Sequence, residues 1–401
     1  MSPNQPRVIT LTEYEPVHFA PEEIPAKVGE ILFRHYPKQV EVEFPTPKTE
    51  GQWRLRSLGW IGHIPLTPDL HLALLPKVPL ENVFRMLEYA YRLKFDLLAG
   101  LVHCQSLAEF YERLAHVLAL RVLDRGRKGF YRAYLAQAEH LPYVRGRLDV
   151  QPAAQRPGQV KLPCQYEEHT ADIADNQILA WTLYYIAHSG MCTERVLPAV
   201  RQAYRTLQNL VTAVPHGPQA CVNRPYHRLN EDYRPLHALC RFFLDQSGPT
   251  HHFGDQTMLP FLVDMASLYE LFVAEWLKSQ LLPAGLTVTA QEPVEISQDH
   301  RYHIDLVLSD HTTGATRCVL DTKYKAPDKP SNDDINQVAA YATVKACNEA
   351  ILIYPASLVK PLAAKVGNIR VRSLTFSLAG DLEQAGQTFL QALLQPMPVN
   401  H

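Results

Sequence analysis

The chain has 401 residues, of which 46% are hydrophobic and 20% are charged, a balance typical of soluble globular proteins with two or three domains. The formal net charge of −2 excludes a basic surface spread over the whole protein, so any contact with nucleic acid requires local basic patches. The sequence shows neither a signal-peptide pattern at its N-terminus nor an apolar run near the ~18 residues of a membrane helix, so we expect a cytoplasmic protein without membrane contact.

Seven cysteines are scattered along the chain, and no two of them form a C-x-x-C pair. This spacing argues against a zinc ribbon or an iron–sulfur cluster. Unpaired thiols are expected in a reducing compartment, in agreement with a cytoplasmic location.

The N-terminal segment is rich in proline and in short alternating apolar runs. Proline and glycine separate these runs, as they do between brief strands. The pattern predicts a β-rich domain over residues 1–80, with strands at Val8–Leu11, Val40–Phe44, Trp53–Leu58, Trp60–Ile64 and Leu70–Leu75.

The middle region, residues 81–250, is predicted to be mainly helical. Apolar residues recur at helical spacing in five stretches: Leu80–Leu98, Leu107–Leu123, Asp172–His188, Thr193–Val211 and Asp232–Leu244. Gly248, Pro249 and Gly254 break the pattern, so Ser247–Asp255 is interpreted as a linker. We interpret His251-His252 as part of an ordinary loop, because no acidic or cysteine partner lies at ligand spacing.

The segment Arg121–Arg147 is locally basic. The segment contains seven cations but only two acidic residues, Asp124 and Glu139, and three tyrosines are interspersed among the cations. A solvated surface and a contact with phosphate or a protein partner both explain this composition. The cations are Arg121, Arg125, Arg127, Lys128, Arg132, Arg145 and Arg147, and the tyrosines are Tyr131, Tyr134 and Tyr143.

The last segment, residues 256–401, is predicted to be one α/β domain. Its expected order is a helix, three strands, a helix and a strand, followed by further additions. These elements are Phe261–Leu281, Thr287–Ile296, a hairpin within Arg301–Lys325, Asp333–Cys347, Ala350–Tyr354, Ile369–Leu378 and Asp381–Leu394. The fold class is therefore a multidomain α+β or α/β protein.

The hairpin within Arg301–Lys325 carries the residues most indicative of chemistry. Folding it about its polar turn sets Asp305 nearly opposite Asp321, at the ~5 Å Cβ spacing of cross-strand neighbours. Two carboxylates at that distance repel each other unless a proton or a cation lies between them. Lys323 lies on the same face as Asp321.

Two aspartates and one lysine on a hairpin indicate a Mg²⁺ site for phosphodiester chemistry, because Mg²⁺ takes few protein carboxylates and keeps waters and substrate phosphate as ligands. The alternative is a charged outer face that prevents an edge hairpin from pairing with other strands. Apolar residues at the alternate positions favour the metal site.

Two predicted helices add candidate residues. Glu270 lies among Leu268, Leu271, Phe272 and Val273, where it is either an auxiliary metal ligand or a helix-surface acid. Gln337 and Tyr341 are four residues apart and share a helix face, where they either support the site or belong to an ordinary surface.

The pattern Asp305…Asp321-Thr322-Lys323, with this order of helices and strands, resembles the PD-(D/E)xK restriction-endonuclease-like superfamily and its αβββαβ core. Gln337-x-x-x-Tyr341 resembles an accessory motif of some of its branches. The proline that usually precedes the first aspartate is Ile304 here.

The order of several segments along most of the chain also resembles the McrC family, the nuclease subunit of McrBC-type 5-methylcytosine-specific restriction systems. These segments are Gly59-Trp60-Ile61-Gly62, Leu74–Val78, Val144–Arg147, Glu168–Asn176, Leu320–Lys325 and Asp334–Tyr341.

The resemblance implies a Mg²⁺-dependent endonuclease subunit that cleaves modified DNA only in complex with a McrB-like AAA+ GTPase, which forms hexameric rings, and that stimulates its GTP hydrolysis. Asp305, Asp321 and Glu270 would then be metal ligands, Lys323 the water or charge partner, and Gln337 and Tyr341 supporting residues. The first ~250 residues would dock the partner, through the β-rich domain or near Arg145–Arg147. The chain agrees in lacking a G-x-x-x-x-G-K-[ST] nucleotide-binding loop.

Two alternatives remain open from the sequence. One is a non-catalytic adaptor that activates a GTPase ring and keeps a nuclease fold for DNA binding. The other is a stand-alone DNA repair nuclease of the Gln-x-x-x-Tyr branch, in which the long N-terminal arm has no evident purpose.

Overall fold

A computed structural model describes residues 6–93, 104, 106–148, 161–254, 256–297 and 300–395. The chain divides into two compact units. The first combines the residues up to Phe110 with those from Gly248 onward, and the second is Tyr111–Ser247. Among the helices of the described residues, none has the length and apolar character needed to cross a bilayer.

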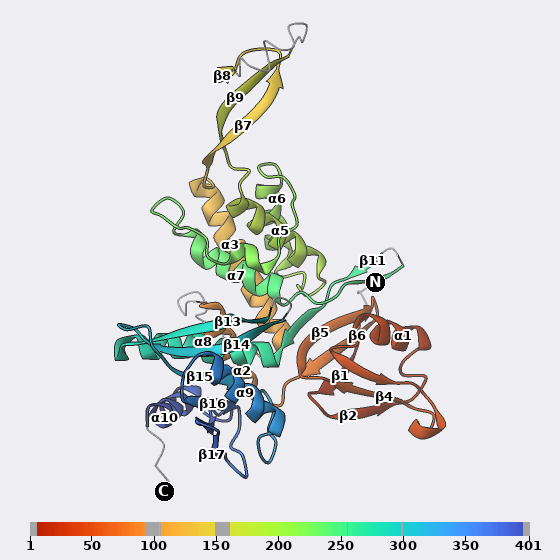
Figure 1. Cartoon of the computed structure of the whole chain (residues 1–401). Coiled ribbons are helices and arrows are strands. Elements are labelled where there is room, and N and C mark those ends of the chain that lie inside the picture. The colour runs from red at the N-terminus through yellow and green to blue at the C-terminus, as the bar shows by residue number, and fades with distance from the viewer. Residues whose placement is uncertain are drawn as a thin grey trace. The chain divides into compact units, whose positions relative to one another are not determined.

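The N-terminal part of the first unit consists of two small sheets and a helix (Figure 1). One sheet has the order β1-β6-β5-β12, with β1 (Arg7–Thr12), β6 (Leu70–Leu75), β5 (Trp60–Thr67) and β12 (Phe261–Asp264). The other has the order β2-β4-β3, with β2 (Pro16–Phe19), β4 (Trp53–Ser57) and β3 (Val40–Glu43). Helix α1 (Ala26–His35) joins their shared core through Val28 and Leu32, and a short 3-10 turn, η1, spans Pro47–Thr49.

All five strands predicted in residues 1–80 are confirmed, whereas α1 and β2 were not predicted. Helix α1 follows a proline and includes Gly29, a poor helix former. Tertiary packing explains that glycine, because a Cβ there would lie 2.1 Å from the Trp53 ring. Tertiary packing, and not the helix propensity of the local sequence, therefore explains why α1 forms.

The interpretation of His251-His252 as a loop is wrong. These residues lie in strand β10 (His251–Phe253), which pairs with β11 (Gln256–Met258). The His251 ring is buried; its Nδ1 is 2.8 Å from the Tyr36 hydroxyl, and its Nε2 is 3.1 Å from the Leu66 carbonyl oxygen. His251 therefore has a structural role in joining β10 to the N-terminal sheets.

The C-terminal part of the first unit is a mixed sheet with the order β13-β14-β15-β16-β18-β17. The hairpin strands β13, β14 and β15 are antiparallel, β15, β16 and β18 are parallel, and β17 is an antiparallel edge strand. Their bounds are β13 (Leu286–Ser297), β14 (His300–Asp310), β15 (Thr316–Thr322), β16 (Glu349–Tyr354), β17 (Ala363–Val366) and β18 (Ile369–Thr375).

Besides α1, the described residues of the first unit form the helices α2 (Leu80–Tyr91), α8 (Met265–Leu281), α9 (Asn332–Val344) and α10 (Leu382–Leu394), with the 3-10 turn η5 at Leu282–Ala284. Val338 and Ala342 of α9 pack on the sheet against Val319 and Leu352. The predicted order of helix, three strands, helix and strand is confirmed, while β17 was not predicted.

The predicted helix Phe261–Leu281 begins four residues too early. Phe261–Asp264 is strand β12, paired with β5, and the Asp264 carboxylate accepts hydrogen bonds from the backbone N–H groups of Ala266 and Ser267 at the start of α8. The predicted domains, residues 1–80, 81–250 and 256–401, also differ from the two observed units. Strand β12 completes the N-terminal sheet, and α2 packs against α8, so both ends of the chain share one unit.

The second unit contains α3 (Leu107–Lys128, whose first residues precede the unit), α5 (Ala174–His188), α6 (Leu197–Gln208), the 3-10 turn η4 (Pro218–Cys221) and α7 (Tyr233–Asp245). The predicted helices are confirmed here; of the predicted Leu80–Leu98, residues 94–98 lie outside the described residues. A three-stranded sheet, β7-β9-β8, was not predicted. Its strands are β7 (Ala133–Leu141), β9 (Leu162–Thr170) and β8 (Arg147–Leu148), and Figure 1 shows β7 and β9 extending from the helices of this unit.

Candidate active site

The register of the β14–β15 hairpin brings Asp305 and Asp321 together. Leu306 pairs with Leu320, Val307 with Val319 and Leu308 with Cys318, and the next step of the same register places Asp305 across from Asp321. The Asp321 residue is only 1% exposed. Strands β14 and β15 lie between β13 and β16 in the sheet, so this is not an edge hairpin; Asp321 is buried and Asp305 is partly buried.

The Asp305 carboxylate is held by the residue that follows Asp321. Its Oδ2 accepts hydrogen bonds from the Thr322 backbone N–H at 2.9 Å and from the Thr322 hydroxyl at 3.1 Å. Both donors come from the neighbouring strand, so the carboxylate has a fixed orientation. No feature of the sequence predicted this role for Thr322.

Lys323 connects the hairpin to helix α9. Its Nζ lies 2.7 Å from Asp321 Oδ2 and donates a hydrogen bond to Gln337 Oε1 at 3.2 Å. The Gln337 amide in turn donates to the Tyr341 hydroxyl at 2.8 Å. The structure thus brings Asp321, Lys323, Gln337 and Tyr341 into one chain of contacts.

The charges of this cluster shift one another's pKa values. Burial, reinforced by the charge of Asp305, raises the pKa of Asp321 to about 6 despite the opposing effect of Lys323. For Lys323, burial alone would lower the pKa, but the charge and hydrogen bond of Asp321 outweigh it and raise the pKa above its usual value. Lys323 is therefore an ammonium ion near neutral pH, suited to neutralising charge rather than accepting a proton.

Glu270 of α8 belongs to the same electrostatic cluster. Burial and the charge of Asp305 raise its pKa to about 7, and Asp321 adds to the effect. Its carboxylate accepts a hydrogen bond from the Gln291 side chain on β13. Glu270 is thus a carboxyl group that a nearby cation would convert to its charged form.

Gln291 is a site residue that sequence reasoning missed. Ala290 pairs with Leu306 and Glu292 with Ile304, so Gln291 falls opposite Asp305. Its φ is +52°, a left-handed conformation that is uncommon for a residue other than glycine. Such backbone strain is concentrated at functional positions, but the sequence carries no signal for it.

Two further contacts follow directly after Lys323. The Tyr324 hydroxyl donates to Glu13 Oε2 at 3.2 Å, which joins the site strand to β1 and the N-terminal sheets across 311 residues. Lys325 Nζ lies 2.6 Å from Asp334 Oδ2 at the start of α9. These contacts position both ends of the connection between β15 and α9.

The donor set fits a hard divalent cation that is only partly held by protein. Within the described part of the chain, no three His, Cys, Asp or Glu side chains are gathered to enclose a metal ion. Mg²⁺ needs no such enclosure, because one or two carboxylates with water and phosphate oxygens complete its shell. The mutual repulsion of Asp305, Asp321 and Glu270, seen in the raised pKa values, is the electrostatic condition that favours a cation.

A buried and a partly buried carboxylate beside a lysine, on a mixed sheet flanked by helices, characterise a mixed α/β protein with a candidate active site. The family model of the McrBC 5-methylcytosine restriction system component matches residues 55–355. The chain therefore belongs to that family.

Two relatives extend the comparison. The type IV methyl-directed restriction enzyme EcoKMcrBC of Escherichia coli (strain K12) is 22% identical over 217 residues, which are 53% of this chain and 62% of that relative, so the chain matches less than two thirds of its length. A solved half-complex of Thermococcus gammatolerans McrB AAA+ hexamers with bound McrC contains a chain with 18% identity and a TM-score of 0.56, covering 96% of this chain and 99% of that chain. The latter likeness shows a shared fold.

Proposed function

We propose that this protein is the Mg²⁺-dependent DNA endonuclease subunit of a McrBC-like, modification-dependent restriction system, with a PD-(D/E)xK core. The observation that carries the proposal is the pair Asp305 and Asp321 across the hairpin register, with the Lys323 ammonium 2.7 Å from Asp321. The αβββαβ order of α8, β13, β14, β15, α9 and β16 supports it.

Each side chain has a distinct task in phosphodiester hydrolysis. Asp305, fixed by Thr322, and Asp321 would hold Mg²⁺, with Glu270 as a further ligand once it is ionised. Bound Mg²⁺ supplies polarisation of the scissile phosphate and a lowered pKa of the attacking water. Lys323 provides positive charge beside the developing negative charge, and Gln337 with Tyr341 holds Lys323 in place.

A McrB-like AAA+ GTPase ring is the proposed partner, as in the archaeal assembly that shares this fold. The β7–β9 hairpin is the part of the second unit that we propose for docking. Tyr134, Tyr143 and Val144 are more than half exposed there, and Arg145 stacks on the Tyr166 ring at 3.9 Å. Exposed aromatic and arginine side chains of this kind are typical of protein contacts.

The decisive experiment co-expresses the chain with its AAA+ partner and measures cleavage of methylated and unmethylated DNA with Mg²⁺ and GTP. Wild type is expected to cut only with the partner, and Asp321→Asn is expected not to cut. The matched control is Asp310→Asn, which changes an aspartate at the exposed hairpin turn whose carboxylate only accepts bonds from Thr312 and Thr313.

The outcomes separate nuclease from adaptor. If Asp321→Asn complexes cut as fast as wild type, the nuclease assignment fails. If no variant or wild-type complex cuts DNA while all of them stimulate GTP hydrolysis, the chain is an adaptor that activates the ring.

A further inference from the structure

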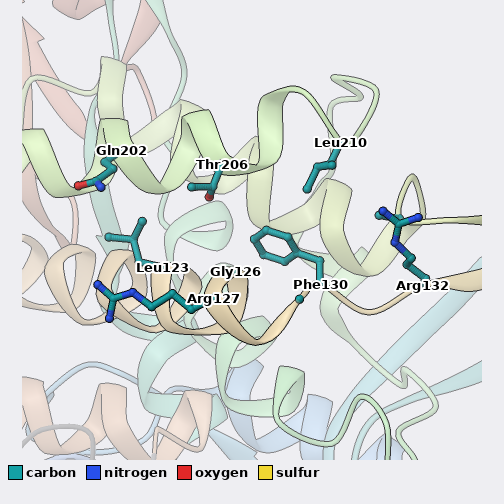
Figure 2. A pocket seen from close by; sticks show the side chains of 10 residues that line it. Leu123, Gly126, Arg127, Phe130, Arg132, Gln202, Thr206 and Leu210 are labelled. Atoms are coloured by element: carbon teal, nitrogen blue, oxygen red, sulfur yellow. The ribbon is translucent and has the colours of Figure 1, made fainter.

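A pocket of about 530 Å³ lies in the second unit, between the end of α3 and helix α6 (Figure 2), whereas the candidate active site belongs to the first unit. Its lining combines two arginines with apolar and polar side chains. Leu123, Arg127, Phe130 and Arg132 come from α3 and the segment after it, and Gln202 and Thr206 come from α6.

The local sequence builds this pocket. Gly129, with φ +90°, ends α3 and lets the chain reverse, since other residues rarely adopt that conformation. Phe130 then lies back over Gly126, where an added Cβ would come within 3.3 Å of the ring. Figure 2 shows Arg127 and Arg132 on either side of the Phe130 ring, so an apolar floor is flanked by two guanidinium groups.

Neither of the two arginines forms an ion pair in the residues described. The adjacent Lys128 and Arg125 pair with Asp124 at 2.7 Å and Asp232 at 3.3 Å. Arg127 has an electrostatic interaction with Asp124, but that carboxylate is already bound by Lys128. The sequence from Arg195 to Asn230, which includes α6, contains no aspartate or glutamate. The helix dipole stabilises cations in the last turn of a helix, which explains the presence of Arg127 in α3 without a ligand. This explanation does not apply to Arg132, which lies beyond the end of α3.

The charge of the whole unit supports the same conclusion. Residues 111–247 contain 17 Lys and Arg against 12 Asp and Glu, a net charge of +5, while the rest of the chain has 22 against 29, a net charge of −7. The near-neutral total of −2 therefore hides two units of opposite sign. A basic unit of this kind attracts a polyanion.

We propose that this pocket is a contact site for the phosphodiester backbone of nucleic acid, an inference that rests on the proposed function. Arg127 and Arg132 would each donate to phosphate oxygens, for which the planar guanidinium is well suited. The Gln202 amide, exposed in the pocket wall, is a further donor, whereas the Thr206 hydroxyl already donates to the Ala203 carbonyl oxygen at 2.7 Å. Phe130 offers an apolar face to a sugar. Contacts of this type hold DNA without reading its sequence.

The test measures binding of the full chain to a fluorescently labelled DNA duplex by anisotropy over a range of salt concentrations, without Mg²⁺. Arg127→Ala/Arg132→Ala is expected to bind about tenfold more weakly and to lower the slope of log K against log salt by about 2, since each phosphate contact contributes about 0.9. Arg127→Lys/Arg132→Lys, which keeps the charges, is expected to retain the slope and lose part of the affinity.

A matched control is Arg34→Ala/Lys38→Ala, which removes the same charge from exposed positions of the first unit and is expected to bind DNA like wild type. Wild-type affinity and slope in the Arg127/Arg132 variant would overturn the inference, as would the absence of DNA binding by the wild-type chain. Intact DNA binding with lost capture of the AAA+ partner would assign the pocket to a protein contact instead. Cleavage lost only in Asp321→Asn leaves the proposed function standing in each of these cases.

Discussion

Two hairpins of this protein have opposite relations to their surroundings. In β14–β15, Leu306, Val307, Val319 and Leu320 are at most 1% exposed, and the Asp321 carboxylate is buried with them. In β7–β9, half of the residues are exposed, including Tyr134 at 67%, and only Cys164 is buried. The buried hairpin offers a carboxyl group with a raised pKa, that of Asp321, whereas the exposed hairpin offers side chains suited to recognition. Secondary structure is the same in both, so burial decides which role each can serve.

The largest expected effect concerns the chemistry of the buried hairpin. Asp305→Asn is predicted to lower DNA cleavage on the order of a thousandfold, because loss of a ligand removes several kcal/mol of metal-based stabilisation. GTPase stimulation is predicted to stay at the wild-type level. Parallel assays of cleavage and GTP hydrolysis in the complex measure both, and loss of both activities in a folded variant would contradict the separation of roles.

The second effect concerns stability. Leu306→Ala is predicted to lower the free energy of unfolding by about 2–5 kcal/mol, because Leu306 is fully buried and its truncation leaves a cavity. The matched change Leu135→Ala on β7 is predicted to cost less than ~1 kcal/mol, since Leu135 is 37% exposed. Denaturant unfolding of the two variants tests the contrast, and equal costs would show that the exposed hairpin is covered in the folded chain.

The third effect concerns recognition by the exposed hairpin. Arg145→Ala removes the stacking on Tyr166 and the 3.5 Å contact with Glu168, and it is predicted to reduce GTPase stimulation several-fold, as expected for an interface arginine worth about 1–2 kcal/mol. Titration of the ring with the variant measures the change. Unaltered stimulation would move the docking surface to another part of the chain.

The smallest effect is a pH dependence of stability. The pKa values of about 6 for Asp321 and about 7 for Glu270 lie above those of the unfolded chain, so their stabilising contribution is complete below about pH 4 and is lost as the pH rises through 6 to 7. Mg²⁺ is predicted to restore stability above pH 7, and Glu270→Gln to flatten the metal-free profile. Thermal unfolding on either side of these pKa values, at about pH 5 and about pH 8, with and without Mg²⁺, tests this. An unchanged profile in Glu270→Gln would remove Glu270 from the cluster.

The same contrast explains what could be predicted from the sequence. The β14–β15 hairpin was predictable because its apolar residues alternate, and its two aspartates fall into register by simple counting. The β7 sequence, AYLAQAEHL, has no such alternation, because neither of its faces packs on a core. Gln291 and Thr322 were not predictable, since their roles depend on a strained backbone and on a neighbouring strand.

The pocket at Arg127 and Arg132 was only partly predictable. The basic composition of Arg121–Arg147 was visible, and the Lys128–Asp124 pair follows from i,i+4 spacing on one helix. The Arg125–Asp232 pair and the placement of Arg127 and Arg132 in one pocket depend on tertiary positions. The charge of α6, which is distant in sequence, adds to the same surface.

The pairing of β12 with β5 has a consequence for how the protein is made. During synthesis, β5 leaves the ribosome with β6 on one side, but its other edge has no partner until the whole second unit has been translated. An open strand edge is a template for pairing with other chains. The bonds from Tyr324 to Glu13 and from Asn82 to the carbonyl groups of Leu378 and Gly380 form later still. A nascent chain stalled after the second unit therefore exposes one edge of β5, and the support of the candidate site strand by Glu13 forms only when Tyr324 returns to the first residues made.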